Sequence, residues 1–177
     1  MRRSAGVELS MFDEIHRLMK LNKYGDIRRK LYSKKDDRLK APFKRHANHS
    51  WYLLGESFFK QGKMIEALAA FRKSFRSDKD DADALMAIGN CLSELSKPRQ
   101  AELAFRKALA LHHEGRAGAL SYNLGNALFD QRKYKEAISF YRRVPYKQKT
   151  LFKRTCKNLK LSKGRLLATN QIKKKRN

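Results

Sequence analysis

The chain has 177 residues and carries 42 lysines and arginines against 17 aspartates and glutamates, a formal net charge of +25. This length is typical of one domain, and no apolar stretch approaches the ~18 residues that would suggest a transmembrane helix. The acidic residues Glu8, Asp13 and Glu14 interrupt the stretch after the basic start Met1–Arg3, so a secretory signal peptide is not expected.

The two cysteines favour an intracellular, reducing compartment. Cys91 and Cys156 lie far apart in the sequence, which argues against a disulfide framework, and Cys91 falls within a predicted helix as a small core residue. We therefore expect a cytoplasmic protein. The C-terminal run Lys173–Arg176 would also fit a nuclear address if the source is eukaryotic.

Residues 1–46 are predicted to form a helical region ahead of three repeats. Within it, the segment Asn22–Ile27 is similar to a segment of the third repeat, whereas bulky Ile15 and Ile27 stand where the repeats have small residues. Two interpretations stay open: an atypical terminal repeat over about residues 8–41, or a plain helical hairpin.

Three glycines mark the repeats. Gly55, Gly89 and Gly125 each follow an apolar residue, and they are separated by 34 and 36 residues. An alanine stands 12 residues after each glycine and an aromatic residue stands 16 after it: Ala67, Ala101 and Ala137, then Phe71, Phe105 and Tyr141. This period predicts an all-α fold, an α-solenoid of helix-turn-helix repeats at 47–80, 81–114 and 118–149.

Each repeat is predicted to contain two helices. The first helices are expected at about 50–61, 83–95 and 117–131, and the second at about 64–76, 98–111 and 134–144. A glycine inside a helix costs about 1 kcal/mol relative to alanine, so three equivalent glycines need a packing reason. We expect close approach of the paired helix, where the repeated alanines also lack bulk, with the aromatic residue filling space toward the next repeat.

The repeats resemble the tetratricopeptide repeat family. The residues that carry the resemblance are Trp51, Leu54, Gly55, Phe58, Ala67, Phe71, Leu85, Ile88, Gly89, Leu92, Ala101, Phe105, Ala108, Leu124, Gly125, Leu128, Ala137 and Tyr141. Ser74 and Val144 depart from the alanine usual in the family, Lys79 departs from proline, and the link at His112–Gly115 is two residues longer.

The positive charge is concentrated at the ends of the chain. Residues 142–177 hold 14 basic and no acidic side chains, whereas residues 51–141 are nearly neutral. We predict a basic helix at 150–168, which caps the stack, and a disordered basic tail at 169–177. Residues expected to contact an anionic partner are Lys153, Arg154, Lys157, Lys160, Lys163, Arg165, Lys173, Lys174, Lys175 and Arg176.

The resemblance implies a concave groove lined by the first helices, which usually holds a peptide. The corresponding residues here are Tyr52, Glu56, Phe59, Met86, Asn90, Glu94, Tyr122, Asn123, Asn126, Phe129 and Asp130. The set is aromatic, polar and slightly acidic. For about half of its aromatic residues, packing between repeats is the alternative role.

A more specific ligand is suggested by two asparagines. Some family members clamp the C-terminal carboxylate of chaperone tails, and Asn90 and Asn123 match the asparagines of that clamp. Lys153 and Lys157 would match its third-helix cations, but Met86 stands where its first lysine should be. The clamp is therefore kept as a minor alternative.

The sequence predicts a non-catalytic scaffold that binds a peptide segment in the groove. No nucleophile motif or phosphate-binding loop occurs, no cofactor is implied, and the pairs His46/His49 and His112/His113 lack the further ligands of a zinc site.

The alternative is an RNA-, ribosome- or DNA-associated protein that contacts phosphate through its basic ends and convex face, with an acidic protein or an anionic membrane as other anionic partners. In a third hypothesis, the C-terminal helix folds back over Glu56, Glu94 and Asp130 and occupies the groove.

Overall fold

The computed structural model describes residues 4–111 and 117–176, with side chains for 12–111, 117–172 and 174. The chain divides into two compact units, Met1–Lys79 and Asp80–Asn177. Within the described residues both units are helical, apart from one short two-stranded hairpin in the first. The all-α class predicted from the sequence is therefore confirmed.

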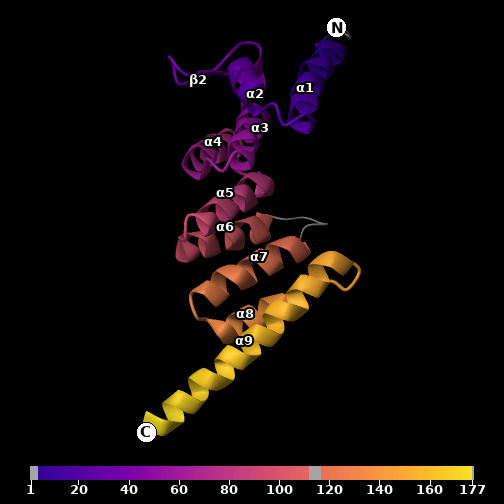
Figure 1. Ribbon diagram of the computed structural model, residues 1–177. Helices are drawn as coiled ribbons and strands as arrows, with labels where there is room; N and C mark the ends of the chain where they lie inside the picture. Colours follow the sequence, from indigo (N-terminus) through magenta and orange to yellow (C-terminus); the bar gives the residue numbers. More distant parts are fainter. Residues whose placement is uncertain (1–3, 112–116, 177) are drawn as a thin grey trace. The chain divides into compact units, whose positions relative to one another are not determined.

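The first unit contains a helix pair, a small hairpin and a second helix pair (Figure 1). In chain order its elements are α1 (Ser4–Lys20), α2 (Tyr24–Leu31), β1 (Tyr32–Ser33), β2 (Arg38–Leu39), the 3-10 helix η1 (Phe43–His46), α3 (Ala47–Lys60) and α4 (Met64–Ser77). The strands are antiparallel, with Tyr32 opposite Leu39 and Ser33 opposite Arg38.

The second unit contains two further helix pairs and a long final helix. Its elements are α5 (Ala82–Glu94), α6 (Pro98–Leu111), α7 (Ala117–Asp130), α8 (Tyr134–Tyr141) and α9 (Lys149–Arg176). The long link His112–Gly115 lies outside the described residues. Helix α9 packs against α8 and less extensively against α7, much as α7 packs against α6 and α5. It therefore takes the place that the first helix of another repeat would have.

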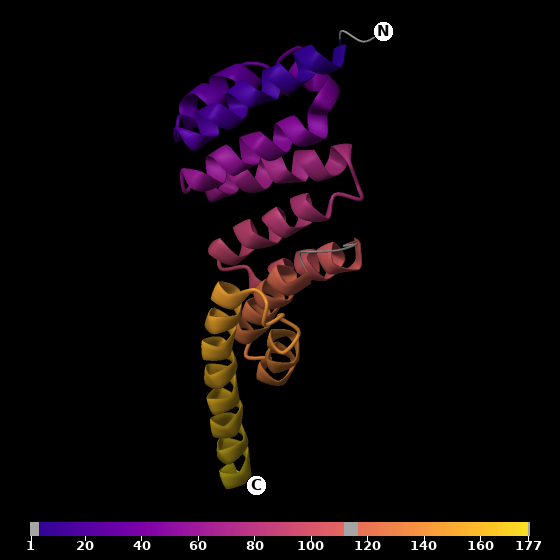
Figure 2. The same ribbon diagram turned by 90° about the vertical axis from the view of Figure 1, so that its right-hand side faces the viewer.

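Helix α3 begins at Ala47 rather than near residue 50, and two other helix ends also differ from the sequence-based predictions. Helix α8 ends at Tyr141 rather than near 144, because its last turn tightens to bonds such as Val144 N to Tyr141 O, and Pro145 follows. Helix α9 does not stop at 168 but continues to Arg176, beyond α8 (Figures 1 and 2). The expected tail is thus helical, since residues 165–176 contain no proline or glycine and are rich in good helix formers.

The repeated glycines are required by the aromatic ring of the same repeat. A Cβ atom added at Gly55 would lie 2.7 Å from the ring of Phe71, one at Gly89 would lie 2.4 Å from Phe105, and one at Gly125 would lie 2.5 Å from Tyr141. All three rings are buried. Each ring therefore occupies the volume in which a side chain at the glycine position of its own repeat would begin. That the ring also fills space toward the next repeat stays a prediction.

The departure at Ser74 is explained by a polar contact across the first repeat. The Ser74 hydroxyl donates to the carbonyl oxygen of Asn48 at 2.9 Å, and the Asn48 amide donates back to the Ser74 hydroxyl oxygen at 3.2 Å. A serine in place of alanine thus links the start of α3 to the end of α4 without leaving a buried hydroxyl unbonded.

The helix pair α1–α2 packs ahead of α3 in a manner similar to a repeat. Ile15, Ile27 and Leu31 are fully buried, and the Ser57 hydroxyl donates to the backbone oxygen of Tyr24, the first residue of α2, at 3.2 Å. In the second unit, the backbone oxygen of Pro98, the first residue of α6, likewise accepts from the side chain of Gln131, the residue that follows α7. This similarity favours the interpretation of residues 8–41 as a degenerate repeat, which stays a prediction.

The cysteines occupy contrasting environments. Cys91 is fully buried in α5, as expected of a core residue, and burial raises the pKa of its thiol to about 12. Cys156 is exposed on α9, and both are free thiols. Among the described residues, no helix combines the length and apolar character needed to cross a membrane.

We predict that Gly89→Ala destabilises the fold whereas Gly164→Ala does not. The new Cβ at position 89 would overlap the buried Phe105 ring, and overpacking costs about 1–3 kcal/mol. At Gly164, inside α9, nothing lies within 4 Å of an added Cβ, so better helix propensity should stabilise by about 0.5–1 kcal/mol. Urea unfolding followed by circular dichroism measures both changes, and equal midpoints for the two variants would contradict the ring contact as the reason for the glycine.

Candidate functional site

The first helices of the second unit are joined by a bridge between two asparagine side chains. The Asn123 amide on α7 donates to the amide oxygen of Asn90 on α5 at 2.9 Å. Both residues are partly exposed. Among the described residues, no hydrogen bond uses the amide nitrogen of Asn90 or the amide oxygen of Asn123. This Asn90–Asn123 bridge therefore presents one donor group and one acceptor group that are available to a ligand.

Two other predicted groove residues are committed to holding α9. The Asn126 amide oxygen accepts from the Tyr141 hydroxyl at 2.8 Å and from the Asn158 amide of α9 at 2.9 Å. Asn158 also donates to the Tyr122 hydroxyl at 3.4 Å, and the ring of Tyr122 is buried against Tyr141. Burial raises the pKa of Tyr141 well above its ordinary value, so its hydroxyl remains a neutral donor.

A cavity of about 290 Å³ lies where α7, α8 and α9 meet. The side chains that line it are Asn126, Phe129, Asp130, Tyr141, Asn158 and Leu161. Phe129 also packs edge-on against Tyr134, with ring centroids 5.3 Å apart. Leu161 of α9 and Asp130 of α7 both line this cavity.

The remaining predicted groove residues lie in both units. On α5, Met86 is partly exposed and Glu94 is exposed. On α3, in the first unit, Tyr52, Glu56 and Phe59 are partly exposed, and the Tyr52 ring packs edge-on against Phe71 at 5.3 Å. Tyr52, Tyr122 and Phe129 thus all pack within their own unit.

The predicted anion contacts on α9 are mostly free of protein partners. Lys153, Arg154, Lys157, Lys160, Lys163, Arg165 and Lys174 are exposed. Arg154 lies over the ring of Tyr122, with its guanidinium carbon 5.6 Å from the ring centroid. The side chains of Lys173, Lys175 and Arg176 lie outside the described residues. No acidic residue occurs in 142–177, so α9 carries its charge without an acidic partner of its own.

A buried carboxylate joins the second repeat to the third, and sequence reasoning missed it. Glu102 of α6 accepts from Arg106 Nε at 2.9 Å, from Gln131 Nε2 at 2.8 Å and from Lys133 Nζ at 2.9 Å. Burial opposes its ionisation, but these donors outweigh burial and hold the pKa of Glu102 at about 2. The sequence did contain one signal for it. Glu102 stands at a repeat position that is apolar in the other two repeats, where Leu68 and Ile138 occur.

Three members of this network, Glu102, Gln131 and Lys133, help to line an open hollow of about 810 Å³ between the start of α6 and the turn from α7 to α8. Because three donors already surround Glu102, its carboxylate stabilises the packing of the second repeat against the third and is not available to bind a ligand. Among the described residues, no group of three or more His, Cys, Asp or Glu side chains is placed to hold a metal ion. The pair His112/His113 lies outside those residues.

The histidines nearest the chain's start belong to an aromatic cluster. Phe12 of α1 packs edge-on against His49 with ring centroids 4.6 Å apart, and His16 lies 5.8 Å from His49. Burial, together with the neighbouring His16 and His46, lowers the pKa of His49. These rings therefore pack α1 against η1 and α3.

Comparison with known families agrees with this fold. A family model described as tetratricopeptide repeat matches residues 86–149, and a second with the same description matches residues 49–81, so that the two cover more than half of the chain. The chain belongs to the tetratricopeptide repeat family.

One curated relative is the type IV pilus assembly protein PilF of Pseudomonas aeruginosa. The two proteins are 29% identical over 106 residues, which are 60% of this chain and 40% of PilF. The chain thus spans less than half the length of that relative.

Solved structures confirm the all-α solenoid class. The first repeat domain of Spaghetti (RPAP3), bound to the HSP90 peptide SRMEEVD, has a TM-score of 0.63 and 24% identity, covering 69% of this chain and 94% of that one. The first repeat domain of human RPAP3 also has a TM-score of 0.63 and 24% identity, covering 71% and 97%. MamA has a TM-score of 0.71 and 19% identity, covering 94% and 86%.

We predict that Glu102 makes stability depend on acid pH. Because its folded pKa of about 2 lies below the ordinary 4.5, its contribution is complete above pH 4.5 and is lost as pH falls toward 2. Glu102→Gln should therefore lower the free energy of unfolding by about 2 kcal/mol at neutral pH, with the difference from the unaltered protein closing between pH 4.5 and 2.

The control is Glu136→Gln, which removes an exposed carboxylate that contacts only one member of the same network, Arg106, at 3.3 Å. An exposed ion pair of this kind contributes about 1 kcal/mol or less. Urea unfolding across the pH series measures both variants. A Glu102→Gln deficit that stays constant down to pH 2 would contradict the assignment.

Proposed function

We propose that this protein is a non-catalytic interaction scaffold in which the face formed by α5 and α7 binds an extended segment of a partner protein. The observation that carries the proposal is the Asn90–Asn123 bridge. An extended peptide alternates backbone N–H and C=O groups, and side-chain amides can bond to both. The free amide nitrogen of Asn90 and the free oxygen of Asn123 supply one partner for each.

The bridge also fixes these groups in place. An isolated surface asparagine loses rotamer freedom when it binds a ligand, whereas a side chain already held by a hydrogen bond has lost part of that freedom. Partly exposed Met86 lies one helical turn before Asn90 on α5 and adds apolar surface beside the bridge. Membership of the tetratricopeptide repeat family supports a protein partner.

A peptide is a chemically suitable occupant of this fold. The Spaghetti domain, which shares the fold, is bound to the peptide SRMEEVD. That example supports the class of ligand and not its sequence. In this chain the cationic first position of a carboxylate clamp is replaced by Met86, so the proposal is restricted to backbone recognition at Asn90 and Asn123.

The sharpest test replaces both bridging asparagines. A displayed peptide library is selected on the unaltered full chain, and the affinity of a selected peptide is measured by titration calorimetry. Asn90→Ala combined with Asn123→Ala should weaken binding by about 10- to 30-fold, because each lost hydrogen bond contributes about 1 kcal/mol. Tyr122 and Asn126 are left intact because their replacement would loosen α9.

Asn170→Ala serves as the matched control, since Asn170 is an exposed asparagine on α9. Its affinity for the selected peptide should equal that of the unaltered protein. Unchanged affinity of the Asn90/Asn123 variant, with an unchanged circular dichroism spectrum, would refute this binding face. Selection of no peptide by the folded protein would count against the wider proposal.

A further inference from the structure

The first unit displays a second charged surface, whose individual residues the sequence-based reasoning did not name. Residues 23–45 contain ten lysines and arginines but three aspartates. We refer to the exposed basic side chains of this segment as the hairpin face: Lys23, Arg28, Arg29, Lys34, Lys35, Arg38, Lys40, Lys44 and Arg45. They come from α2, the β1–β2 hairpin and η1.

The short hairpin separates buried from exposed side chains. Tyr32 and Leu39 are paired across the strands and point inward, where Leu39 is buried and Tyr32 packs edge-on against Trp51. Ser33 and Arg38 form the adjacent pair, so Arg38 points to the opposite, solvent side. The turn between the strands carries Lys34 and Lys35, both exposed.

The aspartates of the segment are already engaged inside the first unit. Asp26 pairs with Arg29, and Asp36 accepts from the Ser33 hydroxyl at 2.7 Å. Asp37 accepts from Lys73 Nζ of α4 at 2.8 Å and from the Tyr32 hydroxyl at 2.7 Å, and these two donors lower its pKa. The negative charges therefore have partners inside the first unit: Asp26 within α2, Asp36 within the hairpin, and Asp37 between the hairpin and α4.

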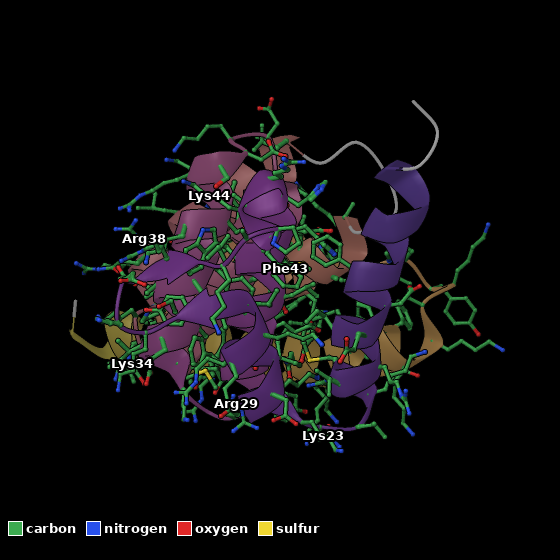
Figure 3. The ribbon with its side chains drawn as sticks, turned by 90° about the horizontal axis from the view of Figure 1, so that it is seen from above. Lys23, Arg29, Lys34, Arg38, Phe43 and Lys44 are labelled. Carbon is green, nitrogen blue, oxygen red and sulfur yellow. The ribbon has the colours of Figure 1, made fainter. Side chains whose placement is uncertain are left out.

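Most of the positive charges have no such partner. Among the described residues, no ion pair or hydrogen bond involves the side chains of Lys23, Arg28, Lys34, Lys35, Lys44 or Arg45. Figure 3 shows Lys44, Arg38, Lys34, Arg29 and Lys23 in succession along one edge, with their side chains directed outward. A row of like charges repels itself, and that repulsion is relieved by an extended polyanion.

We propose that the hairpin face binds the phosphodiester backbone of a nucleic acid. The large apolar side chains of residues 23–45, namely Ile27, Leu31, Leu39 and Phe43, are all buried. Protein partners are held by buried apolar or aromatic anchors, and membrane surfaces by inserted apolar groups, whereas phosphate contacts need neither. The mixture of lysines and arginines is suited to phosphate oxygens, which arginine can contact through two N–H groups.

Helix α9 is a weaker candidate for the same ligand, although its charge is high. Its charges are interspersed with exposed Leu161, Leu167 and Ile172. The exposed apolar groups fit an amphipathic contact better than a purely electrostatic one. The hairpin face is also independent of the α5–α7 face, so either proposal can fail without the other.

The test measures binding of the full chain to a fluorescein-labelled oligouridine of about 20 nucleotides by fluorescence anisotropy. The variant Lys34→Gln/Arg38→Gln/Lys44→Gln should weaken binding about 10-fold at ~0.1 M salt. It should also reduce the slope of log affinity against log salt by about 2, because each single-strand phosphate contact contributes about 0.7. The single variant Lys35→Glu measures, by the same anisotropy titration, how much one exposed side chain contributes to the affinity for the oligouridine.

The charge-matched control is Lys153→Gln/Lys157→Gln/Lys160→Gln on α9, which should change affinity by less than about 3-fold. A deoxythymidine strand of the same length distinguishes DNA from RNA, and binding to either supports a phosphodiester site. Equal losses in both triple variants would show that only net charge matters, and a larger loss in the α9 variant would assign the contact to α9. Stronger binding to phosphatidylserine vesicles or to polyglutamate than to either strand would also overturn the proposal.

Discussion

The repeat array depends on one contact, the packing of a buried aromatic ring onto a helical glycine. Phe71, Phe105 and Tyr141 each lie where a side chain on the paired first helix would begin. A ring in that position sets how closely the two helices approach, and a close-packed interior leaves little room for another arrangement. The positions of Asn90 and Asn123 follow from it, since Gly89 and Gly125 are their near neighbours on α5 and α7.

The repeats could be predicted because this contact joins residues at a fixed separation within one repeat. The same is not true of Glu102, which has no acidic counterpart in the other repeats and whose partners Gln131 and Lys133 belong to the next repeat. The length of α9 was underestimated because the basic composition of 169–177 was interpreted as disorder, although lysine, arginine and glutamine are also good helix formers. The β1–β2 hairpin has two residues in each strand, too few for alternation to be visible.

The sequence predicted which helices carry the candidate site, but it did not predict the role of each side chain on them. Asn90 and Asn123 lie on the predicted helices and stay accessible. Tyr122 and Asn126 have similar positions on α7, yet they bind Asn158 of α9. Which asparagine stays accessible and which bonds to a neighbouring helix depends on how α9 aligns with α7, and that alignment is set by packing over many residues.

The unequal environments of the two cysteines make the protein selectively reactive toward thiol reagents. Cys91 is inaccessible, and its thiolate is suppressed by a pKa near 12, whereas Cys156 is exposed two residues before Asn158. A maleimide fluorophore would therefore attach at one place without any engineered substitution. Its emission would report changes around α9 and the α7 residues that hold it, including those caused by a ligand arriving at the neighbouring α5–α7 face.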